Sequence, residues 1–390
     1  MYKHWDNLSL IIYIFMALIG VICLYYAKKR EMKTSKLTKI SSLPYVIWII
    51  VWTVFASFRY IGNGIGGADS KSYISFFSRC LDSSIDKIIL HFGDDKLFKL
   101  INQVIRFFTS DYHVFFIIIY GFIIYIFIKF INEFCPKKIN FIPFFLIFFV
   151  YLRGFVSLRS NLAIAFILLG IIFISRKENK KGLILLLLSF FIHKSSLLYI
   201  MIYFFYKLYS KGFIKLKHIF LLIIASSLAG LLFQNLFINF SKDWEGAYAS
   251  YASISLNRGF FEGFWKICFG QLLLLAFTII TNKSIKKEIN NSDEIDKKRV
   301  TDIYTICIFD FITVPITYIL NIWRGYEFLY LARLIMWGEI IYIIQSRFPK
   351  NDRKILNIFI WFVFVFWFIF RLYNTWEDSN LMPYYFELFH

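Results

Sequence analysis

The chain is a succession of long apolar runs separated by short polar stretches, and this pattern restricts it to a membrane fold. Hydrophobic residues make up 59% of the sequence and aromatic residues 22%, with a mean hydropathy of +0.62. A soluble domain could not hide that much apolar surface from water. Because a helical span needs about 20 residues, the 390 residues suffice for roughly a dozen spans and their loops.

The apolar runs therefore predict an all-α, polytopic integral membrane protein with about 12 transmembrane helices in a single domain, residues 1–390. The fourth, sixth and seventh runs are short, so we expect those helices to tilt or to be sheltered by protein. In chain order the expected spans are Leu8–Ala27, Leu43–Phe58, His113–Ile131, Phe141–Leu152, Leu158–Ile174, Gly182–Ile192, Ser195–Leu208, Ile219–Phe237, Phe264–Thr281, Ile303–Leu320, Glu327–Gln345 and Ile355–Tyr373.

Lysine-rich loops alternate with poorer ones and predict which side of the membrane each loop occupies. The inner side holds about 27 of the 44 basic residues, of which only about 5 are arginine, and this is the positive-inside asymmetry. The outer side and the outer membrane half hold about 17, and roughly 9 of those are arginine. Lysine alone can direct insertion. Arginine away from the cytoplasm needs another reason, and its planar fork is suited to gripping phosphate or carboxylate.

Three polar segments interrupt the spans. Residues 59–112 form a long outer loop with apolar residues at helical spacing, which predicts short interfacial helices. Residues 239–263 are expected to form a second outer loop, and residues 282–299 a solvated cytoplasmic loop. Topology and anionic lipid headgroups account for the net charge of +19, so the expected partner is the lipid bilayer and no nucleic acid.

The cysteines and short motifs give no sign of a cofactor. The five cysteines show no paired spacing, and neither a phosphate-cradling Gly-Lys-Ser loop nor a His-Glu-x-x-His helix is present. We therefore expect no cofactor, no metal site and no use of ATP.

The first group of candidate site residues follows the second span. Arg59 precedes the glycine-rich stretch 62–67, Asp69 and Tyr73. In a functional interpretation Arg59 holds an anion, the glycines let backbone approach a ligand, and Asp69 accepts sugar hydroxyls or a proton. The alternative is a basic cap on a helix C-terminus followed by an ordinary turn.

The second and third groups lie at two other expected outer turns. Arg153 and Arg159 bracket the turn between the fourth and fifth spans. A cation at a helix start opposes the helix macrodipole, so capping does not explain Arg159 and an anion site is favoured. His193 lies between the sixth and seventh spans and could act as a general base. The alternative is an interfacial turn capped by Ser195 and Ser196.

The fourth group combines Arg324, in an outer turn, with Arg333, about two turns inside the eleventh span. Ionisable residues within a span usually face protein or a watery cavity and are functional candidates by default. Asp310, in the middle of the tenth span, is the obvious partner for Arg333. The alternative is therefore a structural salt bridge between neighbouring spans.

Taken in order, these motifs resemble the EpsG-like branch of the bacterial polysaccharide polymerases, the Wzy type, over most of the chain. Two departures stand out: the glycine turn is longer than the family's, and Ser160 stands where a glutamine is usual. The motifs are Arg59 with the glycine-rich turn, Asp69 and Tyr73; Leu158-Arg159-Ser160-Asn161-Leu162-Ala163; His193-Lys194-Ser195-Ser196; Arg333-Leu334; and Pro383-Tyr384.

The resemblance implies a glycosyltransferase that joins oligosaccharide repeat units carried on polyprenyl (undecaprenyl) diphosphate at the outer face of the bacterial cytoplasmic membrane. The product would be an O-antigen, capsule or exopolysaccharide, and a chain-length regulator and a flippase of the same pathway are the implied protein partners. We expect catalytic roles for His193, Asp69 and Arg159; diphosphate binding by Arg159 and Arg333, then Arg59, Arg324 and Arg153; and sugar binding by Asp69, Tyr73 and Asp310.

Two alternative functions stay open at this point. One is a flippase or transporter for a lipid-linked glycan, which would have charged residues through the membrane depth and helices broken at mid-bilayer. Here the basic residues cluster toward one face, and Pro315 is the one plausible break. The other is a related membrane enzyme, an O-antigen ligase or an acyltransferase, and the sequence separates these poorly from a polymerase.

Overall fold

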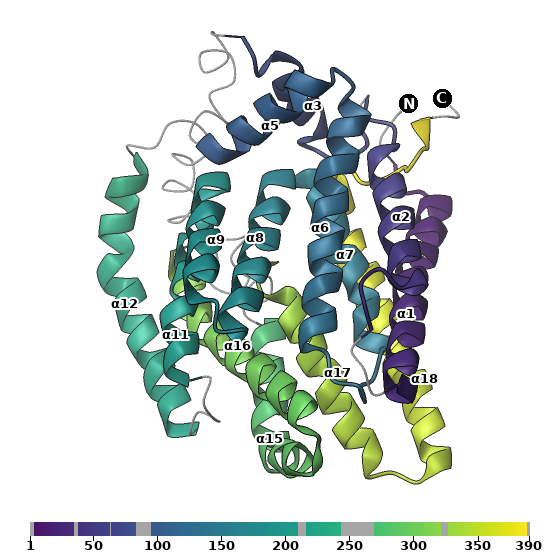
Figure 1. Ribbon diagram of the computed structural model, residues 1–390, viewed down its shortest axis with the longest axis vertical. Coiled ribbons are helices and arrows are strands. Elements are labelled where there is room, and N and C mark those ends of the chain that lie inside the picture. The colour runs from purple at the N-terminus through teal and green to yellow at the C-terminus, as the bar shows by residue number, and fades with distance from the viewer. Residues whose placement is uncertain are drawn as a thin grey trace. The chain divides into compact units, whose positions relative to one another are not determined.

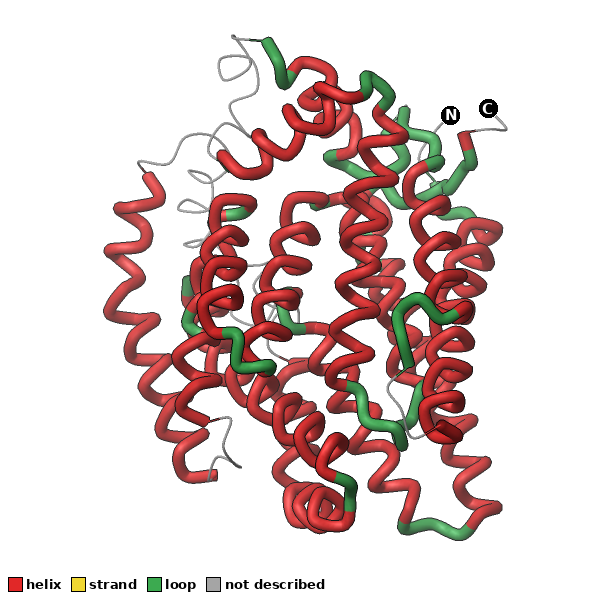
Figure 2. Tube along the Cα trace, viewed as in Figure 1, coloured by secondary structure: helices red, strands yellow, loops and turns green. Residues whose placement is uncertain are grey.

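The structure is a computed structural model that describes residues 4–34, 38–62, 64–82, 95–209, 216–242, 269–320 and 327–387. In these ranges every regular element is helical, and β pairing is limited to two isolated β-bridges (Figure 2). The all-helical expectation is confirmed for this part of the chain.

The helices follow the apolar runs of the sequence closely (Figure 1). In chain order they are α1 (Asn7–Thr34), α2 (Leu43–Ser57), α3 (Ser70–Arg79), α5 (Lys96–Phe108), α6 (Tyr112–Phe134), η1 (Ile142–Leu146), α7 (Ile147–Val156), α8 (Leu158–Ser175), α9 (Asn179–Ile192), η2 (Lys194–Ser196), α10 (Leu197–Ile200), α11 (Ile202–Tyr209), α12 (Leu216–Lys242), α15 (Phe269–Asn291), α16 (Glu294–Ile319), α17 (Tyr330–Ser346), α18 (Lys350–Tyr373) and α19 (Trp376–Ser379).

Five described helices are long and apolar enough to cross a membrane: α1, α6, α8, α16 and α18. Shorter apolar helices cover Leu43–Ser57, Ile142–Val156 and His218–Leu232. Each expected span overlaps helix where it is described, although residues 264–268 of the ninth lie outside the described residues and the seventh is divided among η2, α10 and α11. The count of about 12 crossings is not confirmed. The reason is length: the 14 residues of α9 rise about 21 Å, against a hydrocarbon core about 30 Å thick.

The expectation of a loop at residues 282–299 was wrong. Helix α15 continues to Asn291, and α16 begins at Glu294, where the Asp293 side chain accepts a hydrogen bond from the Asp296 N–H (2.8 Å). Ile285 and Ile289, one helical turn apart, are both buried, so an apolar stripe continues through the polar run. Of the second expected outer loop, residues 243–263 lie outside the described residues.

Two short helices do occur in the segment 59–112. Helix α5 exposes an apolar stripe, with Phe107 78% and Phe108 80% exposed, while Phe98 and Asn102 are buried. A helix with one apolar face left uncovered is typical of a membrane interface. That α5 lies on the membrane stays a prediction, and the apolar residues expected to form another helix at 85–92 lie outside the described residues.

The contacts divide the chain into two compact units. Unit 1 comprises Met1–Asp82, Leu100–Ala165 and Trp337–His390, and unit 2 comprises Ser83–Lys99 and Phe166–Met336. The boundaries fall within α5, α8 and α17, so each of these helices contributes to both units.

In unit 1, α1, α2, α6 and α7 run side by side (Figure 1). Their core is aromatic: the ring of Trp52 lies 5.4 Å from that of Trp48, 4.9 Å from Phe148 and 5.0 Å from Tyr151. Gly20 lets α1 approach these rings, because a Cβ at this position would lie 2.9 Å from the Trp52 ring. The packed aromatic layer therefore supports the end of α2, where the first candidate site begins.

In unit 2, α11, α12 and α15 pack against α16. The end of α8 meets the start of α9 at two glycines, since a Cβ on Gly182 would lie 2.8 Å from the Gly170 carbonyl oxygen. Such close approach of small residues is a common way for membrane helices to associate. Helix α16 thus occupies the centre of unit 2 and carries Asp310 in a buried position.

Candidate functional site

Arg59 lies directly beyond the end of α2 and is fully buried in unit 1. Its guanidinium group contacts the rings of Phe116, Tyr120 and Phe155, and the guanidinium carbon lies 4.1 Å from the centre of the Phe155 ring. No ion pair of Arg59 is found among the described residues. Its nitrogens donate to the carbonyl oxygens of Gly66 (2.8 Å) and Ala56 and to the hydroxyls of Ser70 (2.8 Å) and Tyr120 (3.0 Å).

The hydrogen bond from Arg59 to the Ala56 carbonyl has the geometry expected of a basic cap on the C-terminus of α2. The Ala56 carbonyl belongs to the last turn of α2, where a cation is favoured by the macrodipole. The charge is met by oxygen dipoles and aromatic faces, which together can hold a buried guanidinium. Arg59 therefore joins the end of α2 to the glycine-rich turn and to α3.

The glycine-rich turn passes very close to the end of α7. Gly66 and Gly67 have φ values of +87° and +106°, a region that side chains rarely adopt. A Cβ on Gly67 would overlap the carbonyl oxygen of Phe155. The same carbonyl accepts the Ser70 hydroxyl at 2.7 Å, so the turn, α3 and α7 meet at this point.

Gly67→Ala is expected to destabilise the protein, because alanine meets both an unfavourable φ and the Phe155 carbonyl. Backbone strain alone costs about 1–2 kcal/mol. We expect a lower midpoint of thermal unfolding for the purified protein in detergent. Gly270→Ala is the matched control, because a Cβ there has nothing within 4 Å. Equal midpoints for both variants would contradict the proposed close approach.

The C-terminal segment, residues 379–387, ties these elements together. The amides of Gly67 and Ala68 donate to the carbonyls of Asn380 (2.9 Å) and Ser379 (3.0 Å), and the Tyr60 amide donates to Tyr385 (2.9 Å). Tyr384 reaches further in. Its ring stacks on Phe55 at 4.2 Å, its hydroxyl donates to the Phe55 carbonyl (2.8 Å), and its amide donates to the Ser9 hydroxyl (2.7 Å). Burial raises the pKa of the Tyr384 phenol, so it remains a hydrogen-bond donor.

Arg153 and Arg159 bracket the turn between α7 and α8, as expected from the sequence. Asn161 closes this turn, since its side-chain amide donates to the Val150 carbonyl at 3.1 Å. Arg153 is half-buried and donates to the Ser379 hydroxyl at 3.2 Å. Arg159 is 7% exposed in the first turn of α8, against the macrodipole. Arg153 thus reaches the same C-terminal segment that binds the glycine turn.

Asp69 and Tyr73 lie at the start of α3 and differ in exposure. Asp69 occupies the position before the helix with φ −94° and ψ −2°, and its carboxylate makes no capping hydrogen bond. Among the described residues this half-buried carboxylate forms no hydrogen bond or ion pair. It is therefore available to accept a hydrogen bond or a proton. Tyr73 is 1% exposed and packs into the core of unit 1.

In unit 2, Arg333 pairs with Asp310, as the sequence suggests. The Arg333 Nε lies 3.1 Å from the Asp310 Oδ2, and the residues are 7% and 0% exposed. Gln271 of α15 donates to the other carboxylate oxygen at 3.1 Å. Arg333 also lies over the Tyr330 ring, 4.9 Å from its centre. Its buried Nη2 has no hydrogen-bond partner among the described residues.

His193, the other candidate base, ends α9 in an extended conformation and is 3% exposed. The Ser196 amide donates to the His193 carbonyl (3.0 Å), and the hydroxyls of Ser189 and Ser196 are 3.0 Å apart. Helices η2 and α10 both begin without a side-chain capping hydrogen bond, so the structure contradicts a turn capped by Ser195 and Ser196. The imidazole is buried inside unit 2. Arg324 lies outside the described residues.

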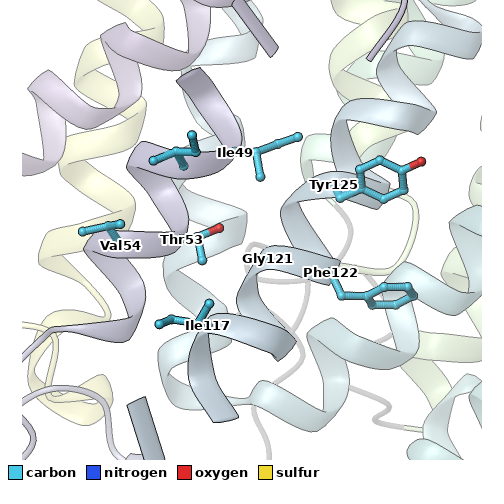
Figure 3. A pocket seen from close by; sticks show the side chains of 8 residues that line it. Ile49, Thr53, Val54, Ile117, Gly121, Phe122 and Tyr125 are labelled. Carbon is cyan, nitrogen blue, oxygen red and sulfur yellow. The ribbon is translucent and has the colours of Figure 1, made fainter. Parts of the chain in front are cut away.

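A lateral apolar groove runs between α2 and α6 in unit 1, with a volume of about 540 Å³ (Figure 3). Thr53 points toward Gly121 across the groove. A Cβ added to Gly121 would lie 3.6 Å from the Thr53 side chain, which is an ordinary van der Waals distance. The groove is lined by Gly121, which follows Tyr120 in α6, but by none of the residues that bind Arg59. The described residues contain no group of three or more side chains able to hold a metal ion.

Sequence reasoning missed the residues that hold the arginines. Ser70, Tyr120 and Ser379 contact Arg59 or Arg153, and Gln271 binds Asp310. Serine and tyrosine near a membrane surface are common, so they give no signal alone. A glutamine inside an apolar run, as Gln271 is, is the one clue that could have been used.

A sequence model of the EpsG family matches residues 42–386, which covers most of the chain and all the motif residues described above. No curated protein and no solved structure matches the chain. The family and the apolar helices together indicate a membrane protein with a polysaccharide polymerase-type function. The chain belongs to the EpsG family.

Proposed function

We propose that the protein is a membrane glycosyltransferase that joins oligosaccharide repeat units carried on polyprenyl diphosphate. One observation carries the proposal. At the start of α3, an unpaired carboxylate, Asp69, directly follows the glycine-rich turn, and this turn is bound to the same C-terminal segment as Arg153. A base for a sugar hydroxyl and a cation for a departing phosphate thus lie in one neighbourhood.

The reaction needs no nucleotide. The acceptor hydroxyl attacks the anomeric carbon of the donor sugar, the bond from that carbon to the diphosphate oxygen breaks, and the hydroxyl proton passes to a base. The electrons of the broken bond leave on the polyprenyl diphosphate. Positive groups fixed where this negative charge develops can lower the barrier by several kcal/mol, on the order of 3 for one donor.

Within this proposal Asp69 is the first choice for the base, because its carboxylate is unpaired among the described residues. His193 is the second choice. In unit 1, Arg159 and Arg153 are the candidates for binding the diphosphate; Arg333 and Arg324 stay candidates from the sequence alone. Arg59 acts through the turn that it holds, since its fork already donates to protein oxygens. Tyr73 and Asp310 remain candidates for binding sugar, although Asp310 already holds Arg333.

The lipid part of the donor also has a fitting surface. The groove between α2 and α6 is lined almost entirely by carbon, and its lining on α2 ends at Val54, five residues before Arg59. A polyprenyl chain there would leave its diphosphate near the end of α2. The proposed location is the bacterial cytoplasmic membrane with the site facing outward, acting in O-antigen, capsule or exopolysaccharide synthesis with a flippase and a chain-length regulator.

Deleting the gene and separating the surface polysaccharide on a gel tests the proposal. We expect the long-chain ladder to disappear while single repeat units remain. Wild-type protein and Asp352→Asn, a substitution of an exposed carboxylate at the start of α18, should restore the ladder; Asp69→Asn should not. Loss of all exported material, single repeat units included, would show a flippase and reject the polymerase.

A further inference from the structure

Three aromatic side chains gather where the chain's first described residues meet the end of α18. The Trp5 ring lies 5.3 Å from the Tyr373 ring and 6.1 Å from the Trp376 ring, edge to face in both pairs. The Trp5 indole N–H donates to the Asn7 side chain at 3.0 Å, which fixes the orientation of the ring. Tyr373 is 62% exposed, and Trp5 and Trp376 are half-buried. We call Trp5, Tyr373 and Trp376 the aromatic platform.

The aromatic platform is connected to the proposed site through one turn of helix. Trp376 begins α19, and Ser379 ends it. Ser379 accepts the Ala68 amide through its carbonyl (3.0 Å) and the Arg153 guanidinium through its hydroxyl (3.2 Å). Ala68 precedes Asp69. A molecule that lies on the platform can therefore extend toward the Asp69 carboxylate along α19.

The polar groups beside the platform favour a sugar over a lipid headgroup. Aromatic residues at a membrane interface commonly anchor a protein among headgroups, and anionic headgroups attract basic neighbours. Here the neighbours on α19 are Glu377 and Asp378, both exposed. Carboxylates repel anionic lipid but accept hydrogen bonds from hydroxyls. A pyranose ring has an apolar C–H face that can cover an aromatic ring, and hydroxyls around its rim.

We propose that the aromatic platform binds uncharged sugar residues of the acceptor glycan, away from the reacting sugar. This inference rests on the proposed function and extends it to how the growing chain is held. Sugars bound at the platform keep a long acceptor near Asp69 between additions. Loss of the platform therefore weakens the hold on long chains more than it slows the first coupling.

The test compares Tyr373→Ala and the double variant Trp5→Ala/Trp376→Ala with Phe359→Ala. Phe359 is the matched control, because it is also an aromatic residue of α18 that is 62% exposed. The probe is an oligosaccharide released by partial hydrolysis from the host's own surface polysaccharide. Its binding to the full-length protein in detergent is measured by saturation-transfer NMR, and the polysaccharide ladder of cells expressing each variant is measured on gels.

We expect the platform variants to bind the probe at least tenfold more weakly and to shift the ladder toward shorter chains without abolishing it. Phe359→Ala should match wild type in both. If the platform variants bind the probe and make the ladder as wild type does, the inference is wrong while the polymerase proposal stands. A lipid anchor is the remaining alternative. If brominated lipids quench the fluorescence of the platform tryptophans and the oligosaccharide does not reverse this quenching, the platform binds lipid and the inference is wrong. If deletion of the gene leaves the ladder intact, the proposed function itself fails.

Discussion

Arg59→Lys should produce a protein that unfolds at a clearly lower temperature and no longer makes the polysaccharide ladder. Lysine keeps the charge but loses the planar fork that donates to oxygens on α2, the glycine turn, α3 and α6. Hydrogen bonds to charged groups contribute about 1.5–3 kcal/mol each, and at least two acceptors would lose theirs. We expect a loss of about 3 kcal/mol or more, and a fall in the unfolding midpoint of about 5 °C or more.

The unfolding midpoint in detergent and the gel of the surface polysaccharide measure the two effects of Arg59→Lys. Arg30→Lys is the control, since Arg30 is exposed on α1 and the same exchange should change neither result. If Arg59→Lys lost the ladder but unfolded at the wild-type temperature, the guanidinium would be acting on substrate. The assignment of Arg59 to holding the turn would then be wrong.

Breaking the buried pair Arg333–Asp310 from either side is expected to be the second large effect. Arg333→Ala leaves a carboxylate, and Asp310→Ala leaves a guanidinium, in a site where both are at most 7% exposed. Removing one partner of a buried ion pair costs about 3–5 kcal/mol, because the other charge remains without compensation. We therefore expect both single variants to be recovered in low yield and to aggregate on size-exclusion chromatography.

The double variant Arg333→Leu/Asp310→Leu separates structure from chemistry. Apolar replacement of both partners of a buried pair is often neutral or stabilising, so this protein should be recovered nearly as well as wild type. Because Arg333 is proposed to contact the diphosphate, the double variant should nevertheless fail to restore the ladder in the deletion strain. If the double variant restores the ladder, the pair serves only to join α16 to α17, and the proposal that Arg333 binds the diphosphate is wrong.

The positions of the helices could be predicted because apolar runs in a membrane must satisfy their backbone internally. The pairing of Arg333 with Asp310 could be predicted for a related reason, since each charge needs a partner within the span. Residues 282–299 were predicted to be a loop because lysine and asparagine are frequent there, but most of them are helical. The stripe of Ile285 and Ile289 within it was the better signal.

The direction in which an arginine points could not be predicted. An arginine at the end of a span looks the same in sequence whether it extends into solvent or folds back, as Arg59 does, onto the last carbonyls of its own helix. The four groups that bind Arg59 come from segments as far apart as Ala56 and Tyr120. Such convergence depends on tertiary packing, and a single sequence carries no local record of it.

The path of residues 379–387 has a consequence for how the protein is made. These residues follow every candidate membrane span in chain order, yet they hydrogen-bond to residues beside α1, α2 and the glycine turn. During synthesis the helices that precede α18 are made before residues 379–387 exist, so the contacts of these residues with Ser9 and the glycine turn form last. A ribosome that stalls within α18 would leave a chain with nearly all its hydrophobic helices in place and no means of completing the Asp69 turn.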